Sequence, residues 1–198
     1  MRFKCFKLLV LLFIVFEANA EVPKEKMREF KSVGAITSFD ELCLKVYTDH
    51  AKAEEWMSSY AHGENKTSGA DSYRESPNDR VFIVGSPLAQ FVVTFGERNL
   101  CSVYGFGVDK DILNKSLAIL MDGYAKSWKT QFVKKGESIK GNMIETTYVA
   151  NIPGTDDPIL GIVAAYWDVE GEQNNLVKLS GVSLKRMQTS NKLSKETP

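Results

Sequence analysis

The sequence predicts an α+β fold, an antiparallel sheet of about six or seven strands with two main helices packed on one face. Two segments repeat apolar residues at the 3.6-residue spacing of a helix, whereas several shorter segments alternate at the two-residue spacing of a strand or are apolar throughout. Short turns join the strand segments, and short turns make antiparallel pairing the default. Because no strand–helix–strand unit repeats, a doubly wound parallel fold is not expected.

Residues 1–20 match a secretory signal peptide. Three basic residues open the chain, the apolar run Leu8–Phe16 follows, and Ala18 and Ala20 occupy the two small-residue positions before a cleavage site. The apolar run is too short to span a bilayer, and no later stretch approaches the roughly 20 apolar residues that a membrane helix needs. We therefore expect a periplasmic or secreted protein with no membrane anchor after signal cleavage.

The charge balance argues against a polyanionic partner. The chain of 198 residues carries 25 Lys and Arg against 25 Asp and Glu, and removal of residues 1–20 leaves 22 against 24. A near-neutral protein without a basic stripe is not expected to bind nucleic acid or anionic lipid. We expect a single domain at 35–185, between a flexible leader at 21–34 and a disordered tail at 186–198.

The first helix is predicted to begin at Ser38, an N-cap residue, with Glu41 three residues later to complete a capping box. A helical stripe of apolar residues then runs as far as Met57, near the glycine at position 63 where the helix should end. The members of this stripe are Phe39, Leu42, Cys43, Val46, Tyr47, His50, Ala53 and Met57.

A metal or acid–base role for this helix is the alternative hypothesis, because His50 and Glu54 stand four residues apart on one face. Asp49 and Glu55 lie nearby, and His62 is the only other histidine. A zinc site would need a further ligand to which the sequence does not point. We therefore expect His50 to be a partly buried or surface residue, and no metal or other cofactor.

The centre of the fold is predicted to be a hairpin followed by the second helix. Phe91–Phe95 and Cys101–Phe106 alternate at period two on either side of a turn. Asp109 stands where an N-cap would, and apolar residues recur at helical spacing as far as Tyr124. We expect this helix to lie across the hairpin.

Two cysteines remain once Cys5 is removed with the signal peptide, and an exported protein meets an oxidising compartment. Cys43 lies on the apolar stripe of the first helix, and Cys101 shares a strand face with Val103. Both side chains should therefore point into the layer between helix and sheet, and we predict a Cys43–Cys101 disulfide that pins the helix to the hairpin. The competing hypothesis, a free catalytic thiol, has no neighbouring histidine motif.

The rest of the chain is predicted to be a long surface loop at 64–79, rich in Ser, Asn, Gly and Asp, and five further strands. Ile159–Trp167 is the most apolar strand, so it should be central and covered on both faces, and Leu176–Leu184 should close the sheet. Lys134–Glu137 is predicted to be a turn. The five strands are expected at Arg80–Gly85, Trp128–Lys134, Met143–Asn151, Ile159–Trp167 and Leu176–Leu184.

No phosphate loop, dinucleotide fingerprint, nucleophile elbow, zinc-protease helix or paired CxxC occurs in the sequence. Gly105 and Gly107 precede the second helix as an anion site would, but Asp109 and Asp111 at its N-terminus would repel a phosphate, which favours a simple turn. Three aromatic residues fit either core packing or a recognition surface on the sheet, namely Tyr148, Tyr166 and Trp167.

The pattern as a whole resembles a family of small exported (periplasmic) proteins of Gram-negative bacteria with no assigned activity. The residues that carry the resemblance are the export signal, the helix start Ser38–Leu44, and the strand Leu100–Val103 followed by a helix that an Asp opens. The resemblance covers about Thr37 to Leu184. It implies a periplasmic or secreted α+β domain and carries over no catalytic residue.

These observations favour a non-catalytic binding or interaction protein of the bacterial envelope, with an exported protein as its partner. An inhibitor or immunity-type protein that caps an exported toxin or hydrolase is one concrete form of this hypothesis. The alternative is a metal-independent envelope hydrolase that uses acidic residues, for which Glu145, Asp168 and Glu170 are the candidates. Capture of a protein partner, or turnover of a cell-wall or ester substrate, discriminates between the two.

Overall fold

The computed structural model describes residues 22–45, 55, 57, 64, 68–86, 88–96, 101–154, 159–168 and 175–183. The predictions for the signal peptide at 1–20, for His50 and His62, for Glu170 and for the tail at 186–198 lie outside these ranges. Within the ranges, no helix is both long and apolar enough to cross a membrane.

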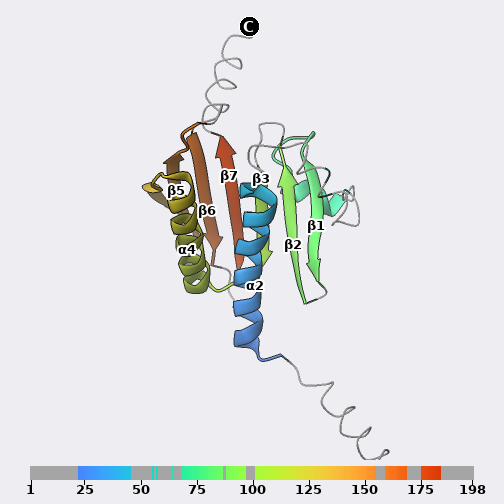
Figure 1. The fold of residues 1–198 in the computed structure, drawn as a ribbon. Helices are drawn as coiled ribbons and strands as arrows, with labels where there is room; N and C mark the ends of the chain where they lie inside the picture. The colour runs from blue at the N-terminus through green and yellow to red at the C-terminus, as the bar shows by residue number, and fades with distance from the viewer. Residues whose placement is uncertain are drawn as a thin grey trace, which may run out of the picture.

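One antiparallel sheet of seven strands forms the body of the protein (Figure 1). Its strands are β1 (Arg80–Ser86), β2 (Ala89–Phe95), β3 (Cys101–Phe106), β4 (Val133–Lys140), β5 (Met143–Asn151), β6 (Ile159–Trp167) and β7 (Leu176–Ser183). In space the order is β1-β2-β3-β7-β6-β5-β4, and every neighbouring pair is antiparallel. With the two helices described next, this sheet confirms the predicted α+β class.

Two helices cover one face of the sheet (Figure 1). α2 (Lys24–Phe39) contacts β3, β2 and β7 at the middle of the sheet, and α4 (Lys110–Trp128) packs beside it, so α2 lies across the β2–β3 hairpin where α4 was predicted. A single π-helical turn, η2 (Asp40–Leu44), continues α2 and buries its last three side chains. The sheet face that carries α2 and α4 is called the helix face below, and the other is called the open face.

The N-terminal half of α2 corrects two predictions. The flexible leader at 21–34 is wrong from Lys24 onward, because this segment is helical, and Ser38 lies inside the helix and not at its start. Ser32 interrupts the apolar pattern of the helix in the sequence. In the fold its hydroxyl is buried, donates to the carbonyl oxygen of Arg28 and accepts from the backbone N–H of Asp109, both at 2.7 Å. The buried stripe of α2 is therefore Ser32, Ala35, Ile36 and Phe39.

Residues 64–79 are only partly the predicted surface loop, because they contain a short 3-10 helix, η3 (Ser68–Tyr73). This helix packs on the open face, where Ala70 is buried in a small apolar cluster with Val81, Val92 and Tyr104. Beyond it the buried carboxylate of Asp79 accepts the backbone N–H groups of two residues, at 2.8 and 2.9 Å. Apolar packing and this internal cap together order the segment.

The strand predicted at Trp128–Lys134 and the turn predicted at Lys134–Glu137 are also wrong. Trp128 is the last residue of α4, and β4 runs from Val133 through the predicted turn to Lys140. The chain turns later, at Gly141, where φ is +61°. A strand rich in lysine with a glycine inside it resembles a turn in sequence, and pairing with β5 decides otherwise.

The strand β7 closes the sheet from its middle. It comes last in the chain but lies between β3 and β6, so it joins the β1–β3 meander to the β4–β6 meander. β6 has the predicted bounds and is an inner strand, with Leu160 and Ile162 buried on the helix face and Ala165 buried on the open face. The long apolar run at 159–167 therefore follows from cover on both faces.

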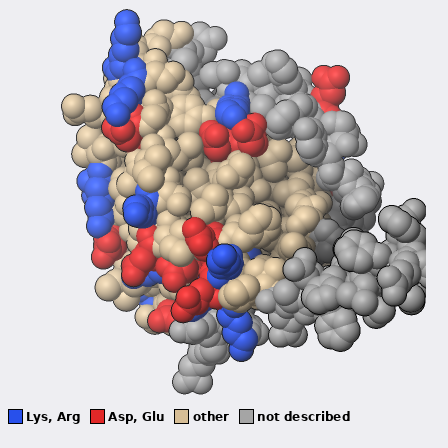
Figure 2. Space-filling view, turned by 60° about the horizontal axis from the view of Figure 1, so that its bottom comes forward, with Lys and Arg blue, Asp and Glu red and all other residues tan. Residues whose placement is uncertain are grey.

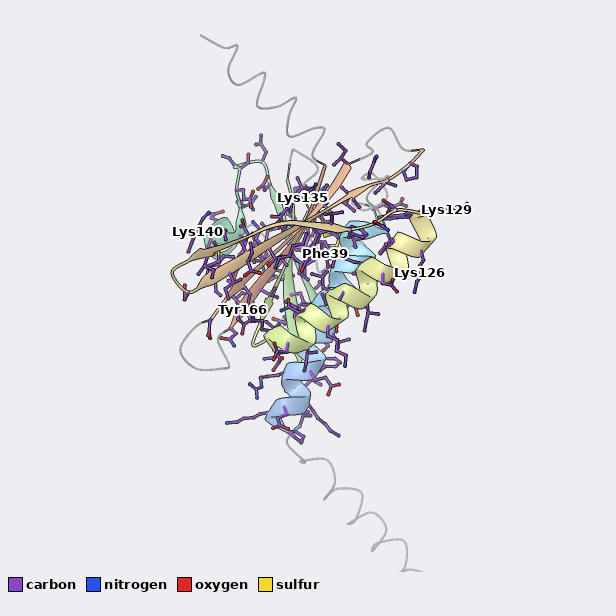
Figure 3. The ribbon with its side chains drawn as sticks, turned by 90° about the vertical axis from the view of Figure 1, so that its left-hand side faces the viewer. Phe39, Lys126, Lys129, Lys135, Lys140 and Tyr166 are labelled. Carbon is purple, nitrogen blue, oxygen red and sulfur yellow. A yellow bond between two sulfur atoms is a disulfide. The ribbon has the colours of Figure 1, made fainter. Side chains whose placement is uncertain are left out.

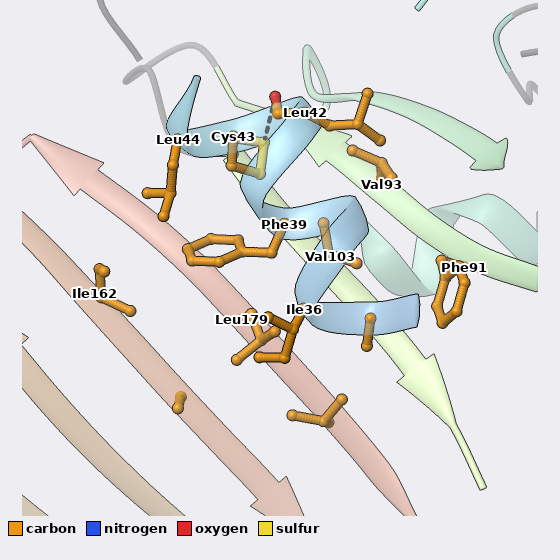
Figure 4. Close-up of a cluster of buried hydrophobic side chains, with 14 of the residues drawn as sticks. Ile36, Phe39, Leu42, Cys43, Leu44, Phe91, Val93, Val103, Ile162 and Leu179 are labelled. Atoms are coloured by element: carbon orange, nitrogen blue, oxygen red, sulfur yellow. Dashed lines mark hydrogen bonds between the residues drawn. A yellow bond between two sulfur atoms is a disulfide. The ribbon is translucent and has the colours of Figure 1, made fainter. Parts of the chain in front are cut away.

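The main core lies between α2, η2 and the sheet (Figure 4). Phe39 is fully buried there, close to Leu179 of β7 and Ile162 of β6. A disulfide joins Cys43 of η2 to Cys101 of β3 in this layer, with the two Cα atoms 5.4 Å apart, as the sequence predicts. It links the end of the first helical element to the central hairpin.

Candidate interaction surface

The helix α4 positions the surface of interest. Its N-cap is the predicted Asp109, whose carboxylate accepts from the backbone N–H groups of Asp111 and Ile112, each at 3.0 Å. Leu113 and Leu117 are buried and hold the helix on the sheet. The opposite side of α4 is therefore turned to solvent, and at its C-terminal end Lys126 and Lys129 are exposed.

The end of α4 sets the place of the next strand. Lys129 has left-handed backbone angles, φ 52° and ψ 47°, and its N–H bonds to the carbonyl oxygen of Ala125. The rings of Tyr124 and Trp128 lie 4.3 Å apart between centroids, and Phe132 continues the row at 6.5 Å from Trp128. Because only residues 129–132 separate helix and strand, the end of α4 and β4 lie on the same side of the molecule (Figure 3).

β4 is an edge strand. It ends the strand order and pairs, in the described part of the chain, with β5 alone. The register shifts between Lys134 and Gly136, and regular pairing continues from Gly136 to Lys140. Two large apolar side chains on this strand are open to solvent, Val133 at 47% and Ile139 at 69% exposure. An edge strand of this kind presents unused backbone N–H and C=O groups to whatever approaches it.

Basic side chains gather along the same side. Between positions 126 and 140 the sequence has five lysines and a single acidic residue. Lys126 and Lys129 lie at the end of α4, and Lys135 and Lys140 lie along β4 (Figure 3). With Lys134 these residues form what we call the lysine edge. It corrects the expectation that the chain holds no basic stripe, although the whole chain is neutral.

The lysine edge is only partly neutralised. Lys126 pairs with Asp122 at 2.6 Å and Lys134 with Glu137 at 2.7 Å. The hydrogen bond between the last two lowers the pKa of the Glu137 carboxyl and raises the pKa of Lys134. The other three lysines form no ion pair with the described residues. On the face seen in Figure 2, acidic and basic side chains are largely intermingled.

A second polar cluster ties α4 to the end of α2. The hydroxyl of Tyr124 donates to Oδ1 of Asp40 at 2.5 Å, and Lys45 pairs with Oδ2 of Asp40 at 3.5 Å and with Glu41. Burial raises the pKa of Tyr124, and the hydrogen bond to Asp40 raises it further. The phenol therefore stays protonated and serves as a structural link between the helices, not as a base.

A third cluster lies on the open face. Lys178 of β7 pairs with Glu75, and its Nζ lies 5.4 Å from the ring centroid of Tyr104, which packs edge-on against Tyr73. Burial lowers the pKa of Lys178, but the hydrogen bond to Glu75 and the attraction of Tyr104 and Glu75 together outweigh burial, so the pKa is raised. Burial also raises the pKa of Tyr104. These charges hold residues 73–75 against the sheet.

The structure does not pair Glu145 with Asp168, the two carboxylates of the hydrolase hypothesis that lie in the described ranges. Glu145 lies on β5 opposite Ala165, on the open face. Asp168 follows β6, and its backbone exchanges hydrogen bonds with Asn142, one to the main chain at 3.0 Å and one from the side chain at 2.9 Å. No hydrogen bond or ion pair joins the two carboxylates within the described ranges, which do not include Glu170. The hydrolase hypothesis stays a prediction.

The three aromatic residues of the recognition hypothesis are divided between the two faces. Tyr148 and Tyr166 are on the helix face, where Tyr148 packs against the main core and Tyr166 lies under Nζ of Lys110, 5.9 Å from the ring centroid. Burial raises the pKa of Tyr166. Trp167 follows Tyr166 directly in β6 and is on the open face. Core packing therefore describes both tyrosines, and the three rings form no common surface.

The remaining candidates have structural explanations. The turn prediction holds only for Gly107, whose φ is +64° and whose N–H donates to the carbonyl oxygen of Asn175 at 2.7 Å, because Gly105 lies in β3. Glu55 is exposed. Among the described residues, no group of three or more His, Cys, Asp and Glu side chains could hold a metal ion.

Sequence reasoning missed the lysine edge. The density of lysine between 126 and 140 was a usable signal, but a whole-chain balance conceals it. The prediction of a turn at 134–137 also removed the strand on which three of these lysines stand. Their common position at a sheet edge follows from the strand order, which no local pattern contains.

Comparison with known proteins identifies no family. No protein-family model matches the chain, and no curated protein matches it. Among solved structures, the fold is compared with that of the Ran-binding protein Mog1p of Saccharomyces cerevisiae, with 16% sequence identity, coverage of 70% of this chain and 86% of that chain, and a TM-score of 0.31. A likeness of this size carries no argument about function.

Proposed function

We propose that this protein is a non-catalytic interaction protein of the bacterial envelope that binds an exported protein partner through the β4 edge and the adjoining C-terminal end of α4. The observation that carries the proposal is the exposed β4 edge, on which Ile139 remains 69% exposed beside the lysine edge. Exposed apolar side chains within a polar rim are typical of protein interaction sites. An inhibitor or immunity-type protein remains one form of this function.

The disulfide supports the envelope part of the proposal. Cys43 and Cys101 are bonded in the core, and disulfides form and persist in oxidising compartments such as the periplasm. The bond also ties the helical layer, in which α4 packs against α2, to β3 of the sheet. Binding surfaces on rigid scaffolds lose less conformational entropy when a partner docks.

The test is affinity capture from a periplasmic extract with the tagged, exported protein and two matched variants. Ile139→Ser removes the open apolar side chain of β4, whereas Ile119→Ser removes one of nearly equal exposure, 67%, from α4. We expect a stoichiometric partner that wild type and Ile119→Ser retain equally and that Ile139→Ser retains several-fold less. No stoichiometric partner, together with turnover of a cell-wall or ester substrate, would contradict the proposal in favour of the hydrolase.

A further inference from the structure

The two edges of the sheet differ in what the chain packs against them. At β1, Arg80 pairs with Glu64 at 3.5 Å and its guanidinium lies over the ring of Phe82, and η3 packs on Val81. At β4, the side chains are exposed along almost the whole strand, and pairing within the described chain is with β5 alone. β4 is therefore the more exposed of the two edge strands.

Edge strands are usually protected, and part of β4 is. The lysines and the register shift between Lys134 and Gly136 are ordinary devices against the pairing of edges. The stretch from Gly136 to Lys140 is different, because its pairing with β5 is regular and it carries the exposed Ile139. An apolar side chain is the opposite of a protective device. About five residues, roughly 16 Å of strand, are thus open to a partner.

The charge of this edge selects among possible occupants. A second copy of the chain would bring its own lysine edge against the first, and like charges across a strand pair are destabilising. A partner segment with Asp and Glu would instead meet lysines that have no ion pair in the described chain, Lys129, Lys135 and Lys140. Charge complementarity of this kind gives specificity and speeds association.

We propose that β4 binds an acidic, extended segment of the partner protein, which adds to the sheet as an eighth strand. This inference rests on the proposed function and names the chemistry of its partner. The register gives the pattern of that segment. Ile139 pairs with Ile144 on the helix face, whereas Lys140 pairs with Met143 on the open face. Because side chains alternate along a strand, apolar residues of the segment lie beside Ile139 and acidic residues beside Lys140.

The first experiment identifies the preferred segment without assuming its sequence. Random peptides of about twelve residues, displayed on phage, are selected on the oxidised protein. Enrichment of sequences in which Asp or Glu alternates with apolar residues is expected. Enrichment of basic or uncharged sequences, or no enrichment, overturns the proposal, as does equal binding of single-stranded DNA of the same charge.

The second experiment tests site and mode with the selected peptide in a fluorescence anisotropy titration. Lys135→Glu/Lys140→Glu should weaken binding on the order of tenfold, since two attractive exposed pairs become repulsive. Lys24→Glu/Lys26→Glu makes the same change of charge on exposed residues of α2 and should have little effect. Equal losses of affinity in both variants would mean that peptide binding depends only on the total charge of the protein.

Backbone pairing has its own control. An added strand uses the N–H groups of every second residue, so two peptides N-methylated on alternate sets of residues should differ. One should bind at least about tenfold more weakly, and the other should bind nearly as well as the parent. Equal binding by both refutes strand addition. Backbone amide shifts confined to β4 and β5 in an NMR titration support it, and shifts elsewhere or a concentration-dependent dimer in size-exclusion chromatography overturn it.

Capture of the native partner separates this inference from the proposed function. If Lys135→Glu/Lys140→Glu captures the partner as well as wild type does, the interaction function stands. The proposal that the partner adds an acidic strand to β4 is then overturned. Loss of capture in this variant, but not in Lys24→Glu/Lys26→Glu, supports both. Absence of any partner for the wild type contradicts the function itself.

Discussion

Removal of the disulfide is the sharpest test of how the fold is held together. The bond spans a sequence separation of 58, joins η2 to β3, and leaves Cys43 and Cys101 only 3% and 4% exposed. In the chain-entropy model, a closed loop of that length stabilises the folded state by roughly 4 kcal/mol. We expect Cys43→Ala/Cys101→Ala to lose about that amount, and up to ~1 kcal/mol more for the small void left in the core.

Alanine is the better replacement here, because serine would place a hydroxyl in an apolar layer and add a desolvation penalty. The assay is urea unfolding followed by tryptophan fluorescence, with the free energy of unfolding taken from the midpoint and slope. Wild type in excess reductant is the control and should unfold at nearly the midpoint of the double variant. A loss below about 1 kcal/mol, or two titratable thiols in denatured and unreduced wild type, would refute the reasoning.

Three further predictions follow from particular contacts. Gly85→Ala should destabilise the protein by more than about 2 kcal/mol in thermal unfolding, because φ is +116° and the new Cβ would lie 2.2 Å from the carbonyl oxygen of Ala89. The control, Gly136→Ala, has open space around its new Cβ and should be nearly neutral. Tyr124→Phe should lose about 1 to 2 kcal/mol at pH 7, since it removes the hydrogen bond to Asp40. The raised pKa of Tyr124 means that the folded state holds this proton more tightly, so wild-type stability should fall as the pH rises above about 10, and this part of the fall should be absent in Tyr124→Phe. Asp109→Ala should lose about 1 kcal/mol through the N-cap, and Asp111→Ala, which caps no N–H, should lose clearly less; equal losses would count against the cap.

The sequence correctly predicted the elements whose residues show a clear cap, a clear apolar periodicity or a continuous apolar run. The cap at Asp109 and the helical spacing after it predicted α4, and alternation or a continuous apolar run predicted β5 and β6 with their bounds. Cys43 and Cys101, the two cysteines outside the predicted signal peptide, predicted the disulfide, since each lies on an apolar face of its own element. For α4, β5 and β6, a few neighbouring residues contain the whole physical reason.

Elements with mixed patterns were predicted wrongly. In α2 a buried serine stands where the stripe needs an apolar residue, and a hydrogen bond to Asp109, 77 positions away, satisfies it. In β4 the side chains are exposed and lysine-rich, so the strand has no apolar alternation and exists because β5 offers it hydrogen bonds. Contacts with residues far away in the sequence decide both cases, and intrinsic helix and strand propensities do not include such contacts.

The candidate interaction surface likewise depends partly on local sequence and partly on long-range contacts. The sequence alone determined that five lysines crowd into residues 126–140, that Cys43 and Cys101 each lie on an apolar face, and that two helices and several short strands must bury one another. Only the tertiary structure decided that β7 enters between β3 and β6, which moves β4 to the rim and turns its lysines and Ile139 to solvent. The physical reason is that strand order depends on which meanders share backbone hydrogen bonds and a common core, and these contacts join residues that are far apart in the chain.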